Sequence, residues 1–335
     1  MKRTAKITIE TLVLCGALLA CTVLQAQRFR YSIPGLDSLE QDFIVSGASS
    51  TVLKTGEAEI ISNNTLTSYW LAYHEYSEDS PIVDRFRLSQ FTSDLYGYYG
   101  ISPSGRWDIG VHLRYNRTRI DNAAASSMLR VFQKEKAFDE NSQGAVLDNS
   151  FGGLASVGIR FRWKPLRLDP RLLVSGGYSI KTITGEVRAR QLAADRNLAD
   201  IGISYYRELN SHTYYYFGGN GQVYFPTPSI TDEYLFNTGA NFFLIHRTTN
   251  NKFTFYPGLV YSLTFRPAKM ETQPHSLIKT TEFVLGYAGI QFAPTGNYNI
   301  FLLSGLPLIV TVTNPQQEIV RPSYSTFTLG LRVGL

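Results

Sequence analysis

A two-residue alternation of apolar and polar side chains recurs along this chain, which is the pattern of strands with two different faces. Segment 106–116 shows it clearly. Its apolar face carries Trp107, Ile109, Val111, Leu113 and Tyr115. Its other face carries Asp108, Gly110, His112, Arg114 and Asn116. The alternation predicts an all-β protein.

Twelve segments of this kind follow one another up to the C-terminus. They lie at 57–75, 83–100, 106–119, 151–164, 170–182, 197–208, 212–225, 232–247, 252–266, 277–292, 297–312 and 320–335. Several exceed the roughly 5–6 residues of ordinary strands, and they meet the ~9–11 residues that a tilted membrane-spanning strand needs. The alternation is less regular in 83–100, 232–247 and 277–292.

The connections between these segments alternate in length. Those after odd segments are mostly long, as at 121–150, 182–196, 267–276 and 314–321. Those after even segments are short and rich in Pro, Gly, Ser and Asn, as at 103–105, 210–211 and 294–296. Short turns at one end and long loops at the other are typical of outer-membrane barrels, whose short turns face the periplasm. The sequence therefore predicts a transmembrane, antiparallel, up-and-down β-barrel of about twelve strands.

The polar face is predicted to line a wet lumen, and the apolar face to meet outer-membrane lipid. Lipid cannot hydrogen-bond a backbone, whereas a closed barrel satisfies its own N–H and C=O groups. Charged side chains would be costly in a sealed apolar interior. The side chains expected to line the lumen are Asp94, Asp108, His112, Arg114, Arg160, Arg162 and Glu282. His112 is either a polar contact for a ligand or part of a hydrated wall.

Composition excludes several other classes of protein. The chain has 335 residues, of which 18% are charged and 13% aromatic. Globular proteins carry about 25% charged residues, and disordered chains are poor in aromatic residues. Two cysteines cannot cross-link a chain of this length. The formal net charge of +5 is mild, and no nucleic-acid partner is expected.

Residues 1–26 form a predicted secretory signal peptide. Lys2, Arg3 and Lys6 precede the apolar run Thr11–Leu24, and Ala26 is a small residue at the cleavage position. The apolar run is shorter than the ~20 residues of a spanning helix. Residues 27–56 then form either a periplasmic segment or a plug, ahead of a barrel at 57–335.

Both cysteines, Cys15 and Cys21, lie in the signal segment. Cleavage after Ala26 would leave no disulfide, thiolate nucleophile or Cys metal site. One alternative stays open, in which Leu18–Cys21 is a lipobox and Cys21 carries a lipid. The bulk of Leu19 and the apolar residues after Cys21 argue against it.

The last eight residues, Thr328–Leu335, resemble the C-terminal targeting signal of bacterial outer-membrane barrels. Thr328, Gly330, Val333 and Leu335 fall on its polar, glycine and two apolar positions, although a terminal Phe is commoner than Leu. The resemblance implies insertion into the bacterial outer membrane by the barrel-assembly machinery. In general layout the chain also resembles transporter barrels of the phenol-degradation (MetA-pathway) type, and this resemblance identifies no ligand.

No catalytic, metal or cofactor site is predicted. The five histidines lack the spacing of a metal site, and no serine lies in a Gly-x-Ser-x-Gly elbow. Gly218–Gly221 is not followed by the Lys-Ser/Thr of a phosphate loop. We therefore expect neither an enzyme nor a bound cofactor.

The expected function is passive passage of small polar or anionic solutes, because a basic excess on the wall, including Arg85 and Arg87, would favour anions. The same charges can instead pair across strands and plug a bore that twelve strands leave narrow. The alternative function is a structural or docking barrel in a secretion or envelope complex, with an envelope protein as partner.

Segment Ala123–Lys136 is predicted to form a short amphipathic helix that constricts the pore or faces a partner.

Overall fold

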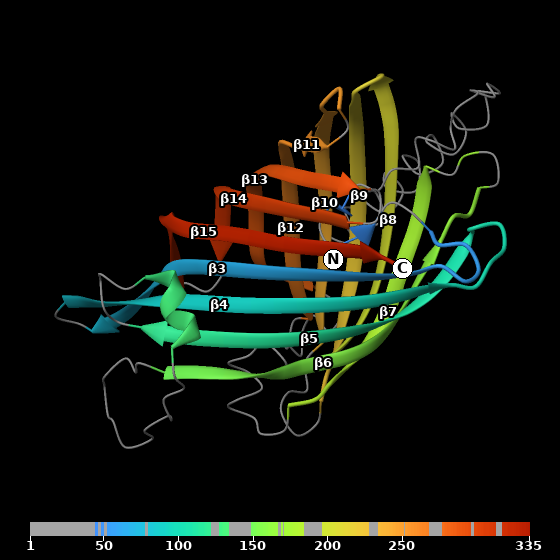
Figure 1. Ribbon diagram of the computed structural model, residues 1–335. Coiled ribbons are helices and arrows are strands. Elements are labelled where there is room, and N and C mark those ends of the chain that lie inside the picture. The colour runs from blue at the N-terminus through green and yellow to red at the C-terminus, as the bar shows by residue number, and fades with distance from the viewer. Residues whose placement is uncertain are drawn as a thin grey trace, which may run out of the picture.

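Twelve antiparallel strands close into one barrel in the computed structural model of this chain (Figure 1). The structure describes residues 44–45, 48–49, 52–77, 80–121, 127–133, 149–166, 169, 171–183, 196–227, 234–250, 252–267, 277–295, 298–312 and 317–335. The predicted signal peptide at 1–26 lies outside these residues. So does most of the pre-barrel segment, apart from the paired strands β1 (Ile44–Val45) and β2 (Ala48–Ser49) and residues 52–56.

The described barrel is an up-and-down meander, in which strands adjacent in sequence pair with one another. Its elements are β3 (Ala58–Ser77), β4 (Ser80–Gly100), β5 (Trp107–Asp121), β6 (Asn149–Trp163), β7 (Leu172–Lys181), β8 (Asn197–Asn210), β9 (Thr213–Phe225), β10 (Leu235–Arg247), β11 (Phe253–Phe255), β12 (Gly258–Pro267), β13 (Leu277–Thr295), β14 (Tyr298–Val312) and β15 (Gln317–Gly334). Closure comes from β15, which pairs with β3 from Gly334↔Glu59 to Gln317↔Tyr73. The predicted up-and-down barrel is confirmed.

Strands β11 and β12 are two parts of one barrel strand. Both pair with β10 on one side and with β13 on the other. The interruption falls at Tyr256 and Pro257, because proline has no backbone N–H to donate to the ladder. With this pair counted once, the described strands of the barrel number twelve, as the sequence predicted.

The two ends of the barrel differ in their connections. At the short-turn end, strands are joined by 101–106, 164–171, 211–212, 248–252 and 296–297. At the long-loop end, they are joined by 122–148, 182–196, 226–234, 268–276 and 313–316. The long pair β3 and β4 departs from this trend, since pairing continues to Ser77↔Ser80. Ala58 and Leu335 exchange two backbone hydrogen bonds of 3.2 and 2.8 Å, which ties both ends of the barrel segment to the short-turn end.

Apolar side chains cover the outer wall, and polar ones cover much of the inner wall. On β5 and β6, Ile109, Val111 and Ile159 are exposed, the last to 68%, whereas their neighbours Asp108, His112 and Arg162 are buried. Trp107 and Trp163 stack at 5.0 Å on the outer wall at the short-turn end. A closed ladder with an apolar exterior is the form in which a β-sheet can lie in lipid.

A short 3₁₀-helix, η2 (Met128–Phe132), lies on the outer wall at the long-loop end. It contacts β3, β4 and β5 (Figure 1), and Phe132 packs edge-on against Phe91 at 4.9 Å. Phe91 faces outward with Leu95 and Tyr99, so this part of the predicted helix 123–136 does not constrict the pore. No helix in the described residues is long and apolar enough to cross a membrane.

The four residues that resemble an insertion signal lie in β15 and at its end, next to the closing seam. Thr328 Oγ1 lies 2.9 Å from Thr65 Oγ1 across this seam, and Val333 pairs with Ile60. Leu335 is exposed at the C-terminus. Gly330 faces the ring of Phe301 on β14, and a Cβ at this position would lie 1.8 Å from Phe301 Cζ. Their role in membrane insertion stays a prediction.

We expect Gly330→Ala to weaken the barrel, because the added methyl group collides with the buried Phe301 ring, and overpacking typically costs about 1–3 kcal/mol. Heat-modifiable migration on gels would then be lost at a lower temperature than in the wild type. The double variant Gly330→Ala/Phe301→Leu should recover most of the loss. A Gly330→Ala barrel as heat-resistant as the wild type would contradict this packing.

Candidate functional site

An ion-pair cluster lies on the inner wall at the short-turn end. Arg162 donates from Nη2 to Asp108 Oδ2 at 2.6 Å and from Nε to Asp108 Oδ1 at 2.9 Å. The same guanidinium pairs with Glu59, which also accepts from Arg332 Nε at 2.6 Å. Arg162 lies 3.8 Å above the Tyr98 ring, a cation–π contact. All four charged side chains of this cluster are buried, so each must be paired.

A second cluster lies farther along the same wall. Arg114 binds both carboxylate oxygens of Asp94, with Nε at 2.7 Å and Nη2 at 3.2 Å. His112 Nε2 lies 2.7 Å from Asp94 Oδ1, and the imidazole stacks on the Tyr96 ring at 4.5 Å. The Arg114 side chain remains 32% exposed, against 4% for His112. Arg114 is therefore the better placed of the two to meet a solute.

Arg160 lies between these clusters and pairs with Asp200 on β8. Together the three groups contain four arginines and four carboxylates, which are Arg114, Arg160, Arg162 and Arg332 with Asp94, Asp108, Asp200 and Glu59. We call them the charged half-wall, since they lie on β3–β6, β8 and β15. Its charges balance, so its own field gives anions little preference.

The structure brings together six of the seven residues predicted to line the lumen, and it places Glu282 elsewhere. On β13, Leu285 and Gln291 are buried while Ala288 and Ile290 are exposed, so odd positions face inward. Glu282 therefore faces outward, where it accepts from Tyr261 Oη at 3.2 Å and from Lys279 Nζ at 2.9 Å. Apolar residues occupy both faces of this strand, so polarity did not mark the inner one.

Arg87 also lies outside the lumen, contrary to the sequence-based expectation. On β4, Leu95 and Tyr99 are exposed on the outer wall, and Arg87 shares their face. Its Nε donates to Ser68 Oγ at 2.8 Å on the outer side of β3. The side chain of Arg85 is outside the described residues. Arg87 therefore does not contribute to the basic excess that was expected on the inner wall.

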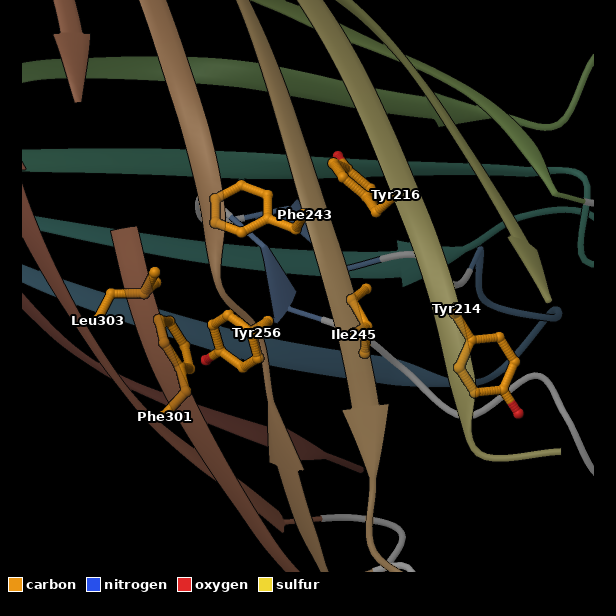
Figure 2. Close-up of a cluster of buried hydrophobic side chains, with 7 residues drawn as sticks. All are labelled: Tyr214, Tyr216, Phe243, Ile245, Tyr256, Phe301 and Leu303. Atoms are coloured by element: carbon orange, nitrogen blue, oxygen red, sulfur yellow. The ribbon is translucent and has the colours of Figure 1, made fainter. Parts of the chain in front are cut away.

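A second part of the inner wall, on the opposite strands, is mainly aromatic and aliphatic. Figure 2 shows the buried side chains of this aromatic half-wall, which are Tyr214, Tyr216, Phe243, Ile245, Tyr256, Phe301 and Leu303. They come from β9, β10, the β11–β12 junction and β14. Tyr256 fits against Gly289, where a Cβ would lie 2.1 Å from its ring. The lumen thus has two unlike halves, one charged and one aromatic.

Residues just before the barrel contact the charged half-wall. Leu53 N donates to Asp108 Oδ2 at 3.0 Å, and the Leu53 side chain is buried with Ile61 and Tyr98. Val52 is buried as well. Because Asp108 and Tyr98 face the lumen, residues 52–53 lie against the inner wall at the short-turn end. Whether 27–51 form a plug stays a prediction.

Sequence reasoning missed Glu59 and Arg332 as site residues. Glu59 lies close to the start of the predicted strand 57–75. Arg332 faces inward, on the same face of β15 as Thr328 and Gly330. The alternation did indicate Arg332, because Arg332 lies on the polar face of the last predicted strand, and that face was expected to line the lumen. Phe243 was missed because its neighbours Phe242 and Leu244 are also apolar. Among the described residues, no three His, Cys, Asp or Glu side chains converge as a metal site would require.

We expect Arg162→Met to destabilise the barrel by about 3–5 kcal/mol, because buried Asp108 loses its arginine and buried Glu59 keeps only Arg332. The matched control is Lys279→Met. Lys279 pairs with Glu282 on the outer wall, where the two side chains are 43% and 26% exposed, and loss of such a pair costs about 0–1 kcal/mol. Urea unfolding in detergent micelles measures both changes. Equal effects of the two substitutions would contradict the buried network.

Similarity to one solved channel supports the fold, and two further barrels align less closely. The COG4313 outer membrane channel from Pseudomonas putida F1 aligns with a TM-score of 0.59 at 10% identity, covering 87% of this chain and 100% of that one. The β domain of the Bordetella autotransporter BrkA gives 0.45 at 12% identity, covering 82% and 100%. The CymD monoaromatic hydrocarbon channel gives 0.40 at 11% identity, covering 84% and 88%.

No protein-family model matches the sequence, and no curated protein is similar to it in sequence. The structural similarity agrees with the expected resemblance to transporter barrels at the level of fold. The closed meander, its apolar exterior and its polar inner wall lead to one conclusion: the chain has the fold of a bacterial outer-membrane β-barrel, and its apolar outer wall is suited to lipid.

Proposed function

We propose that this barrel is a passive channel for small polar or anionic solutes, and that solutes combining such a group with an apolar ring pass best. The observation that supports the proposal is the two unlike halves of the inner wall. Charged side chains on β3–β6 lie in the same lumen as the aromatic cluster on β9, β10 and β14. A solute with one polar and one apolar side can contact both halves at once.

Arg114 is the residue that meets the polar group in this proposal. Its guanidinium is paired with Asp94, yet it keeps the largest exposed fraction among the charged half-wall arginines, at 32% against 15% for Arg160, 6% for Arg332 and 1% for Arg162. Arg247 adds one more cation on the inner wall near the short-turn end, 5.8 Å from the Tyr214 ring.

Passage in this channel is by diffusion alone. Fixed charges and hydroxyl groups replace part of the hydration shell of the polar group, while the aromatic rings contact the apolar part. Width and charge then select among solutes, with no energy source within the barrel. We expect no catalysis, since passage makes and breaks no covalent bond.

A docking barrel without a pore is the second candidate, and one observation favours it. The charges at the short-turn end are paired with one another, and Leu53 packs against them, which narrows this end of the lumen. Purified protein in a planar lipid bilayer separates the two functions. Ohmic channels support the pore, whereas a silent barrel that co-purifies with envelope proteins supports docking.

In the same recordings, we expect Arg114→Glu to lower the permeability of chloride relative to potassium, because it reverses an accessible charge on the wall. The reversal potential in a KCl gradient measures the change. The control is Lys252→Glu, at an exposed position in a short turn outside the lumen. An unchanged reversal potential in Arg114→Glu would show that Arg114 does not line the conducting path.

The aromatic half-wall calls for a separate test with two anions of the same charge. We expect benzoate to interrupt the current for longer than acetate, since its ring can stack on Tyr206 and Tyr287, the partly buried rings that pack against the cluster. The double variant Tyr206→Ser/Tyr287→Ser should remove this difference while channels still open. Equal residence of benzoate in the wild type and in the variant would contradict a role for these rings.

A further inference from the structure

The outer wall carries a cluster of arginines that the channel does not use. It lies on β4, β5 and η2, and comprises Arg87, Arg117, Arg119 and Arg130 around Asp121. Arg119 and Arg130 both pair with Asp121, and Arg117 donates to a backbone carbonyl rather than to a carboxylate. Positive charge on a wall that faces a membrane is suited to an anionic ligand.

The height of the arginine patch fits the boundary between acyl chains and headgroups. The exposed apolar residues of β5 begin at Trp107 and run to Leu113, with Tyr115 next on the same face. From Trp107 to Tyr115 the strand advances roughly 27 Å at about 3.4 Å per residue. At a tilt of about 40° this gives a height of roughly 21 Å, close to the ~25 Å apolar band of such barrels. Arg117 is the next outward residue, just beyond the band.

The arginine patch lies at the long-loop end, which is the outward side in barrels of this class. Its neighbours on the outer wall are therefore the headgroups of the outer leaflet. Lipids of this leaflet carry phosphate groups, which arginine binds through charge-assisted hydrogen bonds.

The internal contacts of the patch hold the arginines in place. Asp121 pairs with Arg130 Nη1 at 2.9 Å and with Arg119 Nε at 3.4 Å. Arg119 Nη1 also donates to the Arg130 carbonyl at 3.4 Å, and Arg117 donates to the Gln133 carbonyl. These hydrogen bonds and ion pairs hold η2 against β5. The guanidinium groups are therefore held in position without a ligand. The buried Nε of Arg117 has no hydrogen-bond partner within the described residues.

Two apolar side chains of η2 lie beside the charges. Leu129 is 61% exposed and Phe132 is 50% exposed, while Val131 between them is fully buried. Exposed apolar side chains next to arginines are suited to a ligand with both acyl chains and a phosphorylated headgroup. Free phosphate would make no use of Leu129 and Phe132.

We infer that the arginine patch with η2 is a binding site for a phosphorylated glycolipid of the outer leaflet. The partly exposed Arg117 and Arg130 bind the headgroup phosphates, the buried Arg119 holds Asp121 in place, and Leu129 and Phe132 contact the acyl chains. This site lies on the outside of the barrel and is independent of the channel function proposed above.

Native mass spectrometry of the purified full chain in detergent micelles, titrated with lipid A, tests the inference. We expect one saturable lipid A site that weakens with added salt and is about tenfold weaker in Arg117→Gln/Arg130→Gln, because two phosphate contacts are lost. The matched control, Arg207→Gln/Lys252→Gln, removes two exposed positive charges near the short-turn end and should bind as the wild type does.

Dephosphorylated lipid A with the same acyl chains should lose the saturable site in the wild type. Equal binding of both lipids, or equal binding by the patch variant and its control, would overturn the inference. If inorganic phosphate bound saturably and lipid A could not displace it, the site would bind free phosphate, and the inference of a lipid ligand would be wrong. Heat-modifiable migration checks that each variant is folded, and Arg130→Gln alone serves if the double variant fails to fold.

Discussion

Closure of the backbone hydrogen-bond ladder is the constraint on which the rest of this structure depends. In lipid no water is available to hydrogen-bond the backbone N–H and C=O groups of an edge strand. The last strand of the sheet must therefore pair with the first. Here β15 pairs with β3, and the reciprocal bonds between Ala58 and Leu335 complete the seam at the short-turn end. Once the sheet is closed, the alternation of the strands sends one set of side chains into lipid and the other into the lumen.

The lumen is therefore built from side chains that the closed sheet forces together. Glu59 comes from the first barrel strand, Arg162 from the fourth and Arg332 from the last, yet they form one network across the inner wall. Burial obliges these charges to pair. Glycines such as Gly289 and Gly330 leave room for large rings on the neighbouring strands. The result is a wall whose charged and aromatic halves differ in what they can bind.

The sequence predicted the architecture well because the constraint is periodic. Strand number, meander order and the inward position of Asp108 or Arg162 follow from a pattern repeated on every strand. Glu282 and Arg87 were misplaced for different reasons. Glu282 lies on a strand with apolar residues on both faces, and Arg87 lies beyond the lipid band, where the outer wall becomes polar. Alternation alone does not show where the membrane ends.

Pairing between distant residues was beyond the reach of sequence reasoning. The balance of the charged half-wall depends on which carboxylate faces which arginine, as with Arg160 on β6 and Asp200 on β8. Strand register and side-chain rotamers determine which residues pair, and neither can be derived from a single sequence. The packing of η2 against the outer wall likewise depends on contacts such as Phe91 with Phe132, which join two separate segments.

The central claim is that a wet lumen with the stated inner faces runs through a lipid-facing barrel. Single cysteines test it directly, because the barrel segment contains none of its own. Cysteines placed at the inward positions Ser204 and Asn220, and at the outward positions Ile159 and Phe217, would be treated in lipid vesicles with a charged, water-soluble thiol reagent. We expect rapid modification at 204 and 220 and none at 159 and 217. Protection at all four positions, or modification of the outward pair, would contradict the account.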